Sequence, residues 1–464
     1  MRQWPHPKAR NTMQTEKPKT DTIYNLKSPV QVVSKIMQTS AFQYFFTKIS
    51  QAGFLLLGSA LIALVWSNID GEGYKHFWHQ QLSISLAGVT LSHSLVHWVN
   101  DGLMTIFFFT VGLEIKRELL VGGLSDPKRA ALPVAAAIGG MVVPALIYFY
   151  FNQGTDTLSG WGIPMATDIA FSLAVLSLLG PKVPFGLRLF LTAFAIVDDL
   201  GAILVIALFY TPSINLYALG AAVLVTSLLF AFNRLGVRQS FPYAILGILL
   251  WFAVSEAGLH ATIAGVITAM FIPSRGKYDT DLFLDMVSKR LEQIQCHGES
   301  CGQSILVNRN HLDAVQDINL ACKEVETPLQ RLEHSLSSWV GYLILPIFAL
   351  SNAGVSLVGM DPMSALTNPV TQGITFGLLL GKPIGIFTFT FIVAKLLNTS
   401  LIHGTTWTQI LGTGFLGGLG FTMSLFISNL SFDGGLLLEY AKVGIMIGSF
   451  FSAALGYALL RWGK

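Results

Sequence analysis

The sequence predicts an all-α integral membrane protein with about twelve transmembrane helices, and three observations support this fold class. Hydrophobic residues make up 52% of the 464 residues and charged residues only 12%, whereas about 25% are charged in ordinary soluble proteins. The mean hydropathy is +0.58, and the apolar residues form runs of about twenty, the length of a helix that crosses a bilayer. Lys and Arg gather in every second connection between these runs. A large soluble protein is excluded, and a net charge of +3 is too small to indicate a nucleic-acid partner.

The individual spans follow from hydropathy averaged over about 19 residues and broken at polar, Gly or Pro clusters. We expect them near residues 50–69, 96–118, 129–151, 161–180, 186–210, 214–233, 240–256, 258–272, 336–358, 372–396, 407–429 and 438–462. The pair 240–256 and 258–272 is the least distinct, because each is short and only Ala257 separates them.

The orientation follows from the basic residues of the loops. Every second connection carries Lys or Arg, and the intervening loops hold little beyond Lys75 and Lys442. The positive-inside rule therefore predicts that both termini are cytoplasmic. We divide the chain into four parts. Residues 1–48 form a cytoplasmic tail, and residues 49–273 form a first membrane part with spans 1–8. Residues 274–330 form a cytoplasmic insertion, and residues 331–464 form a second membrane part with spans 9–12.

Two connections are longer than simple loops. Residues 82–94 alternate apolar and polar side chains around Ala87-Gly88, which predicts a β-hairpin on the outer face. The hairpin is either a solvated lid or a surface through which two protomers pair, because an exposed strand edge favours pairing. The insertion at 274–330 contains an amphipathic stretch, LFLDMVSKRLEQIQ, that could form a helix.

The three cysteines of the chain all lie in this insertion. Cys296-His297 and Cys301 could suggest a metal site, but no second closely spaced Cys or His pair accompanies them. We therefore expect ordinary reduced thiols, no structural metal and no bound cofactor. No disulfide framework is indicated either.

Four ionisable residues lie near the centres of predicted spans, where a charge costs about 2.5 kcal/mol or more. They are Asp168 in MATDIAF, Asp198 and Asp199 in AIVDDLG, and Lys382 in LLGKPIG. Lys382 could simply neutralise one aspartate as a buried ion pair. Three acids against one base, however, leave a negative excess that protons or a bound cation must neutralise. Asp198 and Asp199 lie about 100° apart on a helix, so one can bind a cation while the other faces Lys382.

Two of the spans contain residues that can interrupt a helix. Pro164 with Ala166-Thr167 lies in the fourth span, and Gly417, Gly418 and Gly420 lie in the eleventh. A broken helix exposes unpaired carbonyls that suit a cation and N–H groups that suit an anion. Asp168 could then balance the positive helix ends and Lys382 the negative ends. The alternative is that these glycines only allow close helix packing.

With these motifs the sequence resembles the NhaA family of bacterial sodium/proton antiporters, from residue 96 to residue 462. The matching strings are FFFTVGLEIKREL, PVAAAIGGMVVPALIY, GWGIPMATDIAFSLAVLSLLG, AIVDDLGAILVIALFY, GLHATIAGVITAMFIP, RLEHSLSSWVGYLILPIFALSNAGVSL, GLLLGKPIG and GLGFTMSLFISNLSF. NhaA is itself one of the known inverted-repeat transporters, so the resemblance implies an inverted repeat with two discontinuous helices that cross at mid-membrane. It also implies a bacterial inner-membrane location.

The resemblance also implies roles for individual residues. Asp199 would be the main cation and proton ligand, with Asp198 beside it as a second carboxylate or as the partner of Lys382, and Thr167 and Asp168 would form the extended break of the fourth span. A further set would be associated with the pH response: Glu114, Arg117, Glu118, Glu333, His334 and, at the other end of the molecule, His260. His260 could equally be a structural histidine, and residues 114–118 only a solvated helix end. The long 274–330 insertion departs from the family pattern.

The expected reaction is electrogenic, pH-regulated exchange of cytoplasmic Na⁺ or Li⁺ for external H⁺ by a protein in the lipid bilayer, with a homodimer formed through the hairpin. A carboxylate site binds either a hard cation or protons, so competition couples the two flows. One alternative is a sodium-coupled symporter for an organic solute, although Ala, Gly, Ile and Leu around the acids leave no polar pocket. The other is an intramembrane aspartyl protease, whose GxGD motif is absent because Phe421 follows Gly420.

Overall fold

The structure is a computed structural model that describes residues 41–86, 89–180, 183–210, 215–294, 309–357, 360–398, 401, 404–432 and 434–463. Thr47–Lys464 forms one compact unit and Met1–Phe46 another, of which only the helical residues 41–46 are described. The expected tail at 1–48 therefore lies almost wholly outside the described residues.

Eight helical stretches in the described part of the chain are long and apolar enough to cross a membrane. They are Ala52–Ile69, Leu95–Leu120, Pro127–Asn152, Phe185–Phe209, Leu216–Arg234, Pro328–Asn352, Pro369–Leu396 and Gly435–Trp462. Two further spans are bent helix pairs, and α10 (Ser240–Glu256) and α11 (Thr262–Phe271) are shorter apolar helices. Each of the expected segments overlaps one of these elements, which confirms the all-helical membrane fold.

Five of the long stretches are single helices: α2 (Ala41–Ile69), α6 (Pro127–Asn152), α8 (Phe185–Phe209), α9 (Leu216–Arg234) and α21 (Gly435–Trp462). The other three each contain a π-helical segment between α-helices. These are α4 (Leu95–His97), η1 (Trp98–Leu103) and α5 (Met104–Leu120); α14 (Pro328–Trp339), η5 (Val340–Ile344) and α15 (Leu345–Asn352); and α17 (Pro369–Phe376), η6 (Gly377–Gly381) and α18 (Lys382–Leu396). Such segments frequently occur at functional sites, and here Lys382 directly follows η6.

The ninth expected span, 336–358, was placed too far along the chain. The α14 helix begins at Pro328 and α15 ends at Asn352, and residues 353–357 have no helical structure. The Thr327 hydroxyl accepts a hydrogen bond from the backbone N–H of Gln330 and caps α14. Hydropathy missed residues 328–335 because polar side chains such as Gln330 and Glu333 lower the average.

The two longer connections are both structured. Strand β1 (Gln81–Leu86) pairs antiparallel with β2 (Val89–Ser94), with Gln81 opposite Ser94 and Leu86 opposite Val89. Helix α3 (Gly71–His79) precedes this hairpin. In the insertion, α12 (Thr280–Ile294) packs against α13 (Arg309–Val325). A short helix, α16 (Pro362–Thr367), precedes α17.

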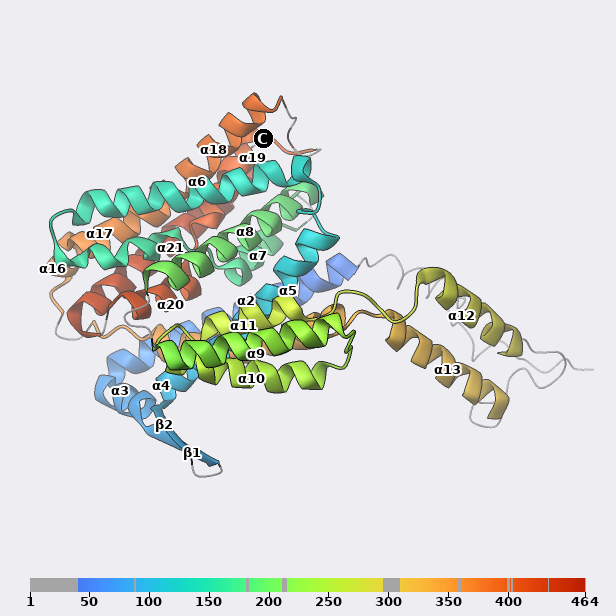
Figure 1. The fold of residues 1–464 in the computed structure, drawn as a ribbon. Coiled ribbons are helices and arrows are strands. Elements are labelled where there is room, and N and C mark those ends of the chain that lie inside the picture. The colour runs from blue at the N-terminus through green and yellow to red at the C-terminus, as the bar shows by residue number, and fades with distance from the viewer. Residues whose placement is uncertain are drawn as a thin grey trace, which may run out of the picture. The chain divides into compact units, whose positions relative to one another are not determined.

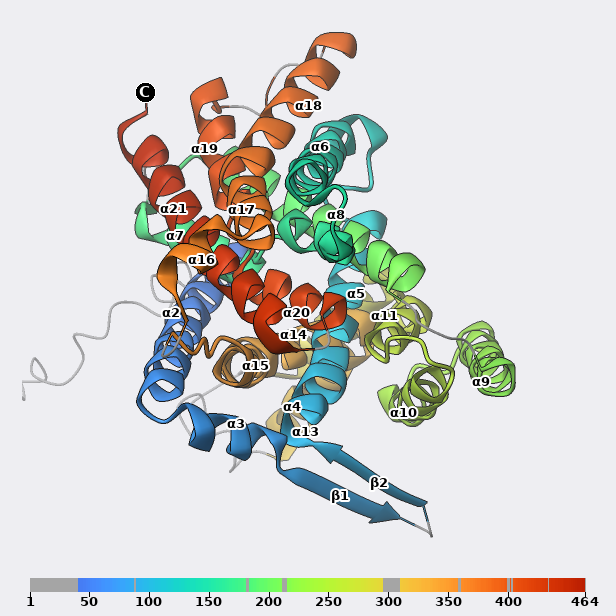
Figure 2. The same cartoon turned by 90° about the vertical axis from the view of Figure 1, so that its left-hand side faces the viewer.

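The helices of residues 47–464 form two groups (Figures 1 and 2). Helices α2, α5, α9, α10 and α11 lie in one row, and α15 packs against η1 at the start of the α5 span. We call this group, including α15 and η1, the row helices. The other group contains α6, α8, α17, α18, α19 (Trp407–Gly417), α20 (Phe421–Ser431), α21, and the pair η2 (Asp156–Met165) and α7 (Ile169–Leu178). We call these the site helices.

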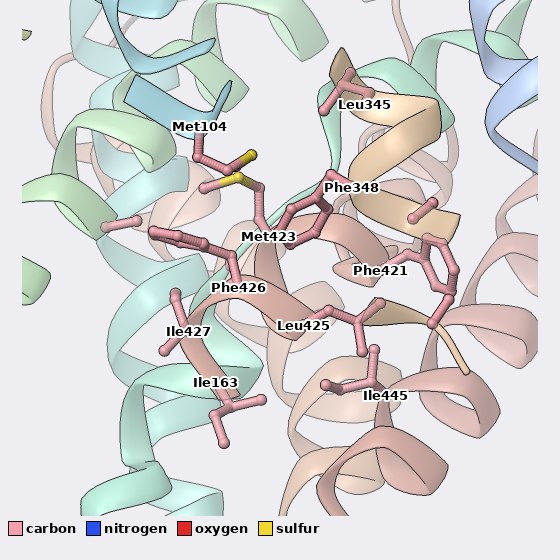
Figure 3. Packing of buried hydrophobic residues seen from close by; sticks show 14 of the residues in the cluster. Met104, Ile163, Leu345, Phe348, Phe421, Met423, Leu425, Phe426, Ile427 and Ile445 are labelled. Carbon is pink, nitrogen blue, oxygen red and sulfur yellow. The ribbon is translucent and has the colours of Figure 1, made fainter. Parts of the chain in front are cut away.

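The core lies where the two groups meet (Figure 3). Phe421, Met423, Leu425, Phe426 and Ile427 of α20 are buried there, together with side chains of η2, α5, α15 and α21. The Phe426 ring lies 5.5 Å from that of Phe108 and 6.2 Å from that of Phe348, measured between ring centroids. The second half of a broken helix is thus held from both groups.

Candidate functional site

The two bent helix pairs cross at the centre of the site helices. The η2–α7 pair bends by 42° and the α19–α20 pair by 44°. Ala166, Thr167 and Asp168 are non-helical and join η2 to α7, and the backbone N–H of Asp168 donates to the carbonyl of Leu419 at 2.7 Å. The two chain breaks therefore lie against each other, with the ends of the four half-helices close together.

Asp168 joins the N-termini of two half-helices. Its Oδ1 accepts a hydrogen bond from the backbone N–H of Phe171 at 2.9 Å and so caps α7. Its Oδ2 accepts from the backbone N–H of Thr422 at 3.1 Å and from the Thr422 hydroxyl at 2.5 Å, at the start of α20. A carboxylate at two N-termini is stabilised by both helix dipoles. The negative charge of Asp168 is therefore compensated by the fold itself.

Thr167 connects the first break to the end of α19. Its hydroxyl donates to the carbonyl of Gly417 at 2.8 Å, and the Ser172 hydroxyl donates to the carbonyl of Leu416, also at 2.8 Å. These bonds give the last carbonyls of α19 side-chain donors from the η2–α7 pair.

The glycines at the second break serve close approach rather than an unusual backbone conformation. Gly418 and Gly420 have φ values of −71° and −90°, which other residues adopt easily. A Cβ at Gly418 would overlap the carbonyl oxygen of Leu378, and one at Gly420 would lie 2.8 Å from the carbonyl oxygen of Ala166. Both sequence interpretations thus apply, since the helix is broken here and its neighbours approach closely. Pro164 lies in η2, just before the first break.

Lys382 forms a buried ion pair with Asp198. Its Nζ lies 2.7 Å from Asp198 Oδ2 and 2.6 Å from the Thr167 hydroxyl, and both charged side chains have 0% exposure. The ammonium group also lies 5.6 Å from the centroid of the Phe194 ring. Among the described residues, Lys382 is linked to the C-terminal end of α19 through the Thr167 hydroxyl, which donates to the carbonyl of Gly417. The expected balance of negative helix ends by this lysine is therefore indirect.

The position of Lys382 depends on close packing between α6 and α18. Gly139 and Gly385 meet at this crossing, where a Cβ on either would overlap the backbone of the other helix. Gly381 similarly packs against Pro144 of α6. Small residues allow such contact between membrane helices, and it brings the start of α18 toward α8.

Asp199 differs from its two acidic neighbours. The residue is only 2% exposed. Its carboxylate nevertheless forms no hydrogen bond or ion pair with any other residue that the structure describes. Its electrostatic neighbours include the acids Asp198, Glu114 and Asp168, with Lys382 as the opposing charge. One oxygen of Asp198, Oδ1, is likewise buried without a partner. The site thus offers carboxylate oxygens of Asp199 and Asp198 that no described residue pairs.

Most of the residues that the resemblance associates with a pH response lie together. Arg117 donates to both carboxylate oxygens of Glu333 at 2.9 and 3.0 Å and to Glu118 at 2.6 Å, with Glu114 4.0 Å away. The backbone N–H of Gly123 donates to Glu118 at 2.8 Å. This cluster ties α5 to α14. Glu114 is also an electrostatic neighbour of Asp199, so the cluster extends toward the central aspartates.

The two histidines of this set are separate from one another. His334 follows Glu333 on α14 and is exposed. His260 bonds through Nε2 to the carbonyl of Tyr210 at 2.6 Å, and Asp101 is an electrostatic neighbour of His260. The structure does not bring His260 into contact with the Arg117 cluster.

Several polar residues of the site carry no charge and escaped the sequence analysis. Thr422 and Ser172 bond directly across the two breaks, and the Ser424 hydroxyl donates to the carbonyl of Ile163 at 2.8 Å. Hydroxyls in an apolar helix are a weak sequence signal, because they often bond within their own helix. In the sequence, only the proximity of these hydroxyls to a helix break indicates that they belong to the site.

The described residues contain no group of three or more His, Cys, Asp or Glu side chains placed to hold a metal ion. Cys296 and Cys301, whose spacing could suggest a metal site, lie outside the described residues. Cys322 on α13 is exposed and has a free thiol.

Comparison with known proteins identifies the family of this chain. Residues 43–460 match the family described as Na+/H+ antiporter 1. The chain is 46% identical over 420 residues to Na(+)/H(+) antiporter NhaA 2 of Syntrophotalea carbinolica, covering 90% of this chain and 95% of the relative. It is 44% identical over 434 residues to the NhaA antiporter of Oleidesulfovibrio alaskensis, covering 93% and 95%. The chain therefore belongs to the NhaA family, and it is a multi-pass membrane Na⁺/H⁺ antiporter rather than an enzyme.

Proposed function

We propose that Asp199 is the main ligand of the transported Na⁺ or Li⁺, with Asp198 as the second carboxylate. The observation that carries this proposal is a difference in compensation. Asp168 is compensated by two helix N-termini and one oxygen of Asp198 by Lys382, while Asp199 has no bonding partner among the described residues. Carboxylate oxygens are the ligands that hard cations prefer.

Exchange follows from competition at these oxygens. A cation and protons neutralise the same carboxylates, so the site carries one or the other in each crossing. When Na⁺ binds Asp199 and Asp198, the Asp198–Lys382 contact of 2.7 Å weakens. The second exchanged proton then comes from this pair and the first from Asp199. Two protons moving inward for one Na⁺ moving outward make the exchange electrogenic, and the membrane potential supplies about 2.3 kcal/mol per charge per 100 mV.

The cellular setting of the proposal is a bacterial inner membrane. The alternating basic loops support cytoplasmic termini, and cytoplasmic Na⁺ then leaves in exchange for external H⁺. The β1–β2 hairpin would mediate a homodimer, because its strands pair only with each other among the described residues and leave two free edges. The Arg117–Glu333 cluster would carry the pH response. It joins two helices next to Glu114, an electrostatic neighbour of Asp199.

The experiment compares Asp199→Asn with Asp156→Asn in everted membrane vesicles. Asp156 is an exposed acid at the start of η2 and provides the same chemical change away from the site. Dequenching of a pH-sensitive dye after addition of NaCl, LiCl or KCl measures exchange. We expect Na⁺ and Li⁺ responses, without a K⁺ response, in the unmodified protein and in Asp156→Asn. Asp199→Asn should show none despite normal insertion. Exchange at an unchanged rate in Asp199→Asn would refute the assignment.

A further inference from the structure

The end of the molecule that carries the hairpin contains a partly buried amide contact between the two helix groups. Asn429, in the last turns of α20, donates through Nδ2 to Asn352 Oδ1 at 3.0 Å. Asn352, at the end of α15 and 2% exposed, donates in turn to Asn100 Oδ1 at 2.8 Å. Because Asn100 lies in η1, directly after the hairpin and α4, this contact joins a site helix to two row segments.

A second contact at the same end uses a buried lysine. Lys442 of α21 is 8% exposed and donates to the carbonyl of Gly354 at 3.1 Å, with Glu439 at 3.6 Å. Gly354 lies just after α15 and packs against the ring of Tyr74, whose hydroxyl donates to the carbonyl of Leu350 at 2.9 Å. The lysine therefore attaches α21 to a segment held by α3 and α15.

Separation of the two groups at this end would break both contacts. A carrier must open its site to one side at a time, commonly by movement of one helix group against the other. Contacts made only while one end is closed stabilise the closed form of that end. Asn429 and Thr422 lie on the same short helix, and Thr422 binds Asp168. A contact at one end of α20 is thus rigidly connected to the ion site.

We propose that Asn352, Asn429 and Lys442 are positioning residues that keep the hairpin end closed and favour access to the site from the opposite end. This inference rests on the proposed exchange at Asp199. One hydrogen bond of this kind changes an equilibrium by about 2- to 10-fold. Because the apparent affinity from one side scales with the fraction of protein open to that side, the affinity from the hairpin side is the sensitive quantity.

The test measures the KM for Na⁺ from each membrane face, in right-side-out and everted vesicles. Asn429→Leu and Lys442→Met remove the two contacts with little change in shape. Asn152→Leu is the matched control, because Asn152 is a buried amide that bonds to Tyr148 and Pro369 within the site helices. We expect Asn429→Leu and Lys442→Met each to lower the KM from the hairpin face by about 2- to 10-fold, with an unchanged or higher KM from the opposite face. Lys442→Arg keeps the positive charge and should therefore retain the KM values of the unmodified protein.

Equal changes of KM from both faces, or none, would show that the contacts are merely structural and would overturn the inference. The inference also fails if Asn152→Leu lowers the KM from the hairpin face alone, as the two test variants are expected to do. If Asn429→Leu fails to insert, Lys442→Met decides alone. Failure of the proposed exchange at Asp199 would give a different result. In that case the unmodified protein would lack exchange, or Asp199→Asn would retain it.

Discussion

The buried pair of Lys382 and Asp198 allows a prediction about stability. Both side chains are fully buried, and 2.7 Å separates their charged atoms. Removal of one partner leaves an unpaired charge, which costs about 3–5 kcal/mol in protein interiors. We therefore expect Asp198→Asn or Lys382→Met alone to destabilise the protein by about this amount. The double variant leaves no charge unpaired, and it should lose about 2 kcal/mol or less relative to the unmodified protein.

The assay is a double-mutant cycle on purified protein in detergent, with thermal unfolding followed by tryptophan fluorescence. The four proteins are measured at one pH without Na⁺, so that bound cation does not stabilise any of them. The cycle isolates the coupling between the two side chains. Additive losses, with the double variant less stable than either single variant, would show that the two groups do not neutralise each other and would refute the ion-pair assignment.

Three further predictions concern the breaks and the insertion. Thr422→Val removes the hydroxyl bond to Asp168 and should slow exchange about 10-fold or less, because the backbone N–H still caps the carboxylate; an unchanged dye response would contradict this role. Gly418→Ala should abolish exchange in inserted protein, since its Cβ would overlap the carbonyl of Leu378, and normal exchange would exclude the tight crossing. Replacing residues 279–323 by a short Gly-Ser linker should retain exchange, because Lys277 and Glu324 already meet through a 2.8 Å backbone bond; complete loss in inserted protein would make the insertion essential.

The sequence was sufficient for the number and approximate position of the spans, for the two breaks and for the four central charges, although the ninth span was placed too far along the chain. The spans follow from composition, because a bilayer demands long apolar helices. The charges stand out because Asp168, Asp198, Asp199 and Lys382 are costly in apolar surroundings. The pairing of Lys382 with Asp198 rather than Asp199 could not be decided from the sequence. It depends on the rotation of α8 and on the packing of α6 against α18.

Neutral polar residues account for most of what the sequence did not reveal. Asn352 and Asn429 are ordinary amides near the ends of apolar segments, and only the fold places them together. Lys442 was counted with the loop charges, whereas the structure places it inside α21 and buries it. The π-helical turn η6 was also unexpected, because a π turn depends on local packing more than on residue type.

The most direct test of the two-carboxylate site is the current that accompanies exchange. Unmodified protein on a supported membrane is exposed to a rapid rise in Na⁺ at one face, and the charge moved is recorded. If one Na⁺ exchanges for protons from both Asp199 and the Asp198–Lys382 pair, positive charge moves toward the face that received Na⁺. The current should vanish in Asp199→Asn. Confirmed Na⁺/H⁺ exchange without any current would mean one proton per Na⁺ and would contradict the proposed site.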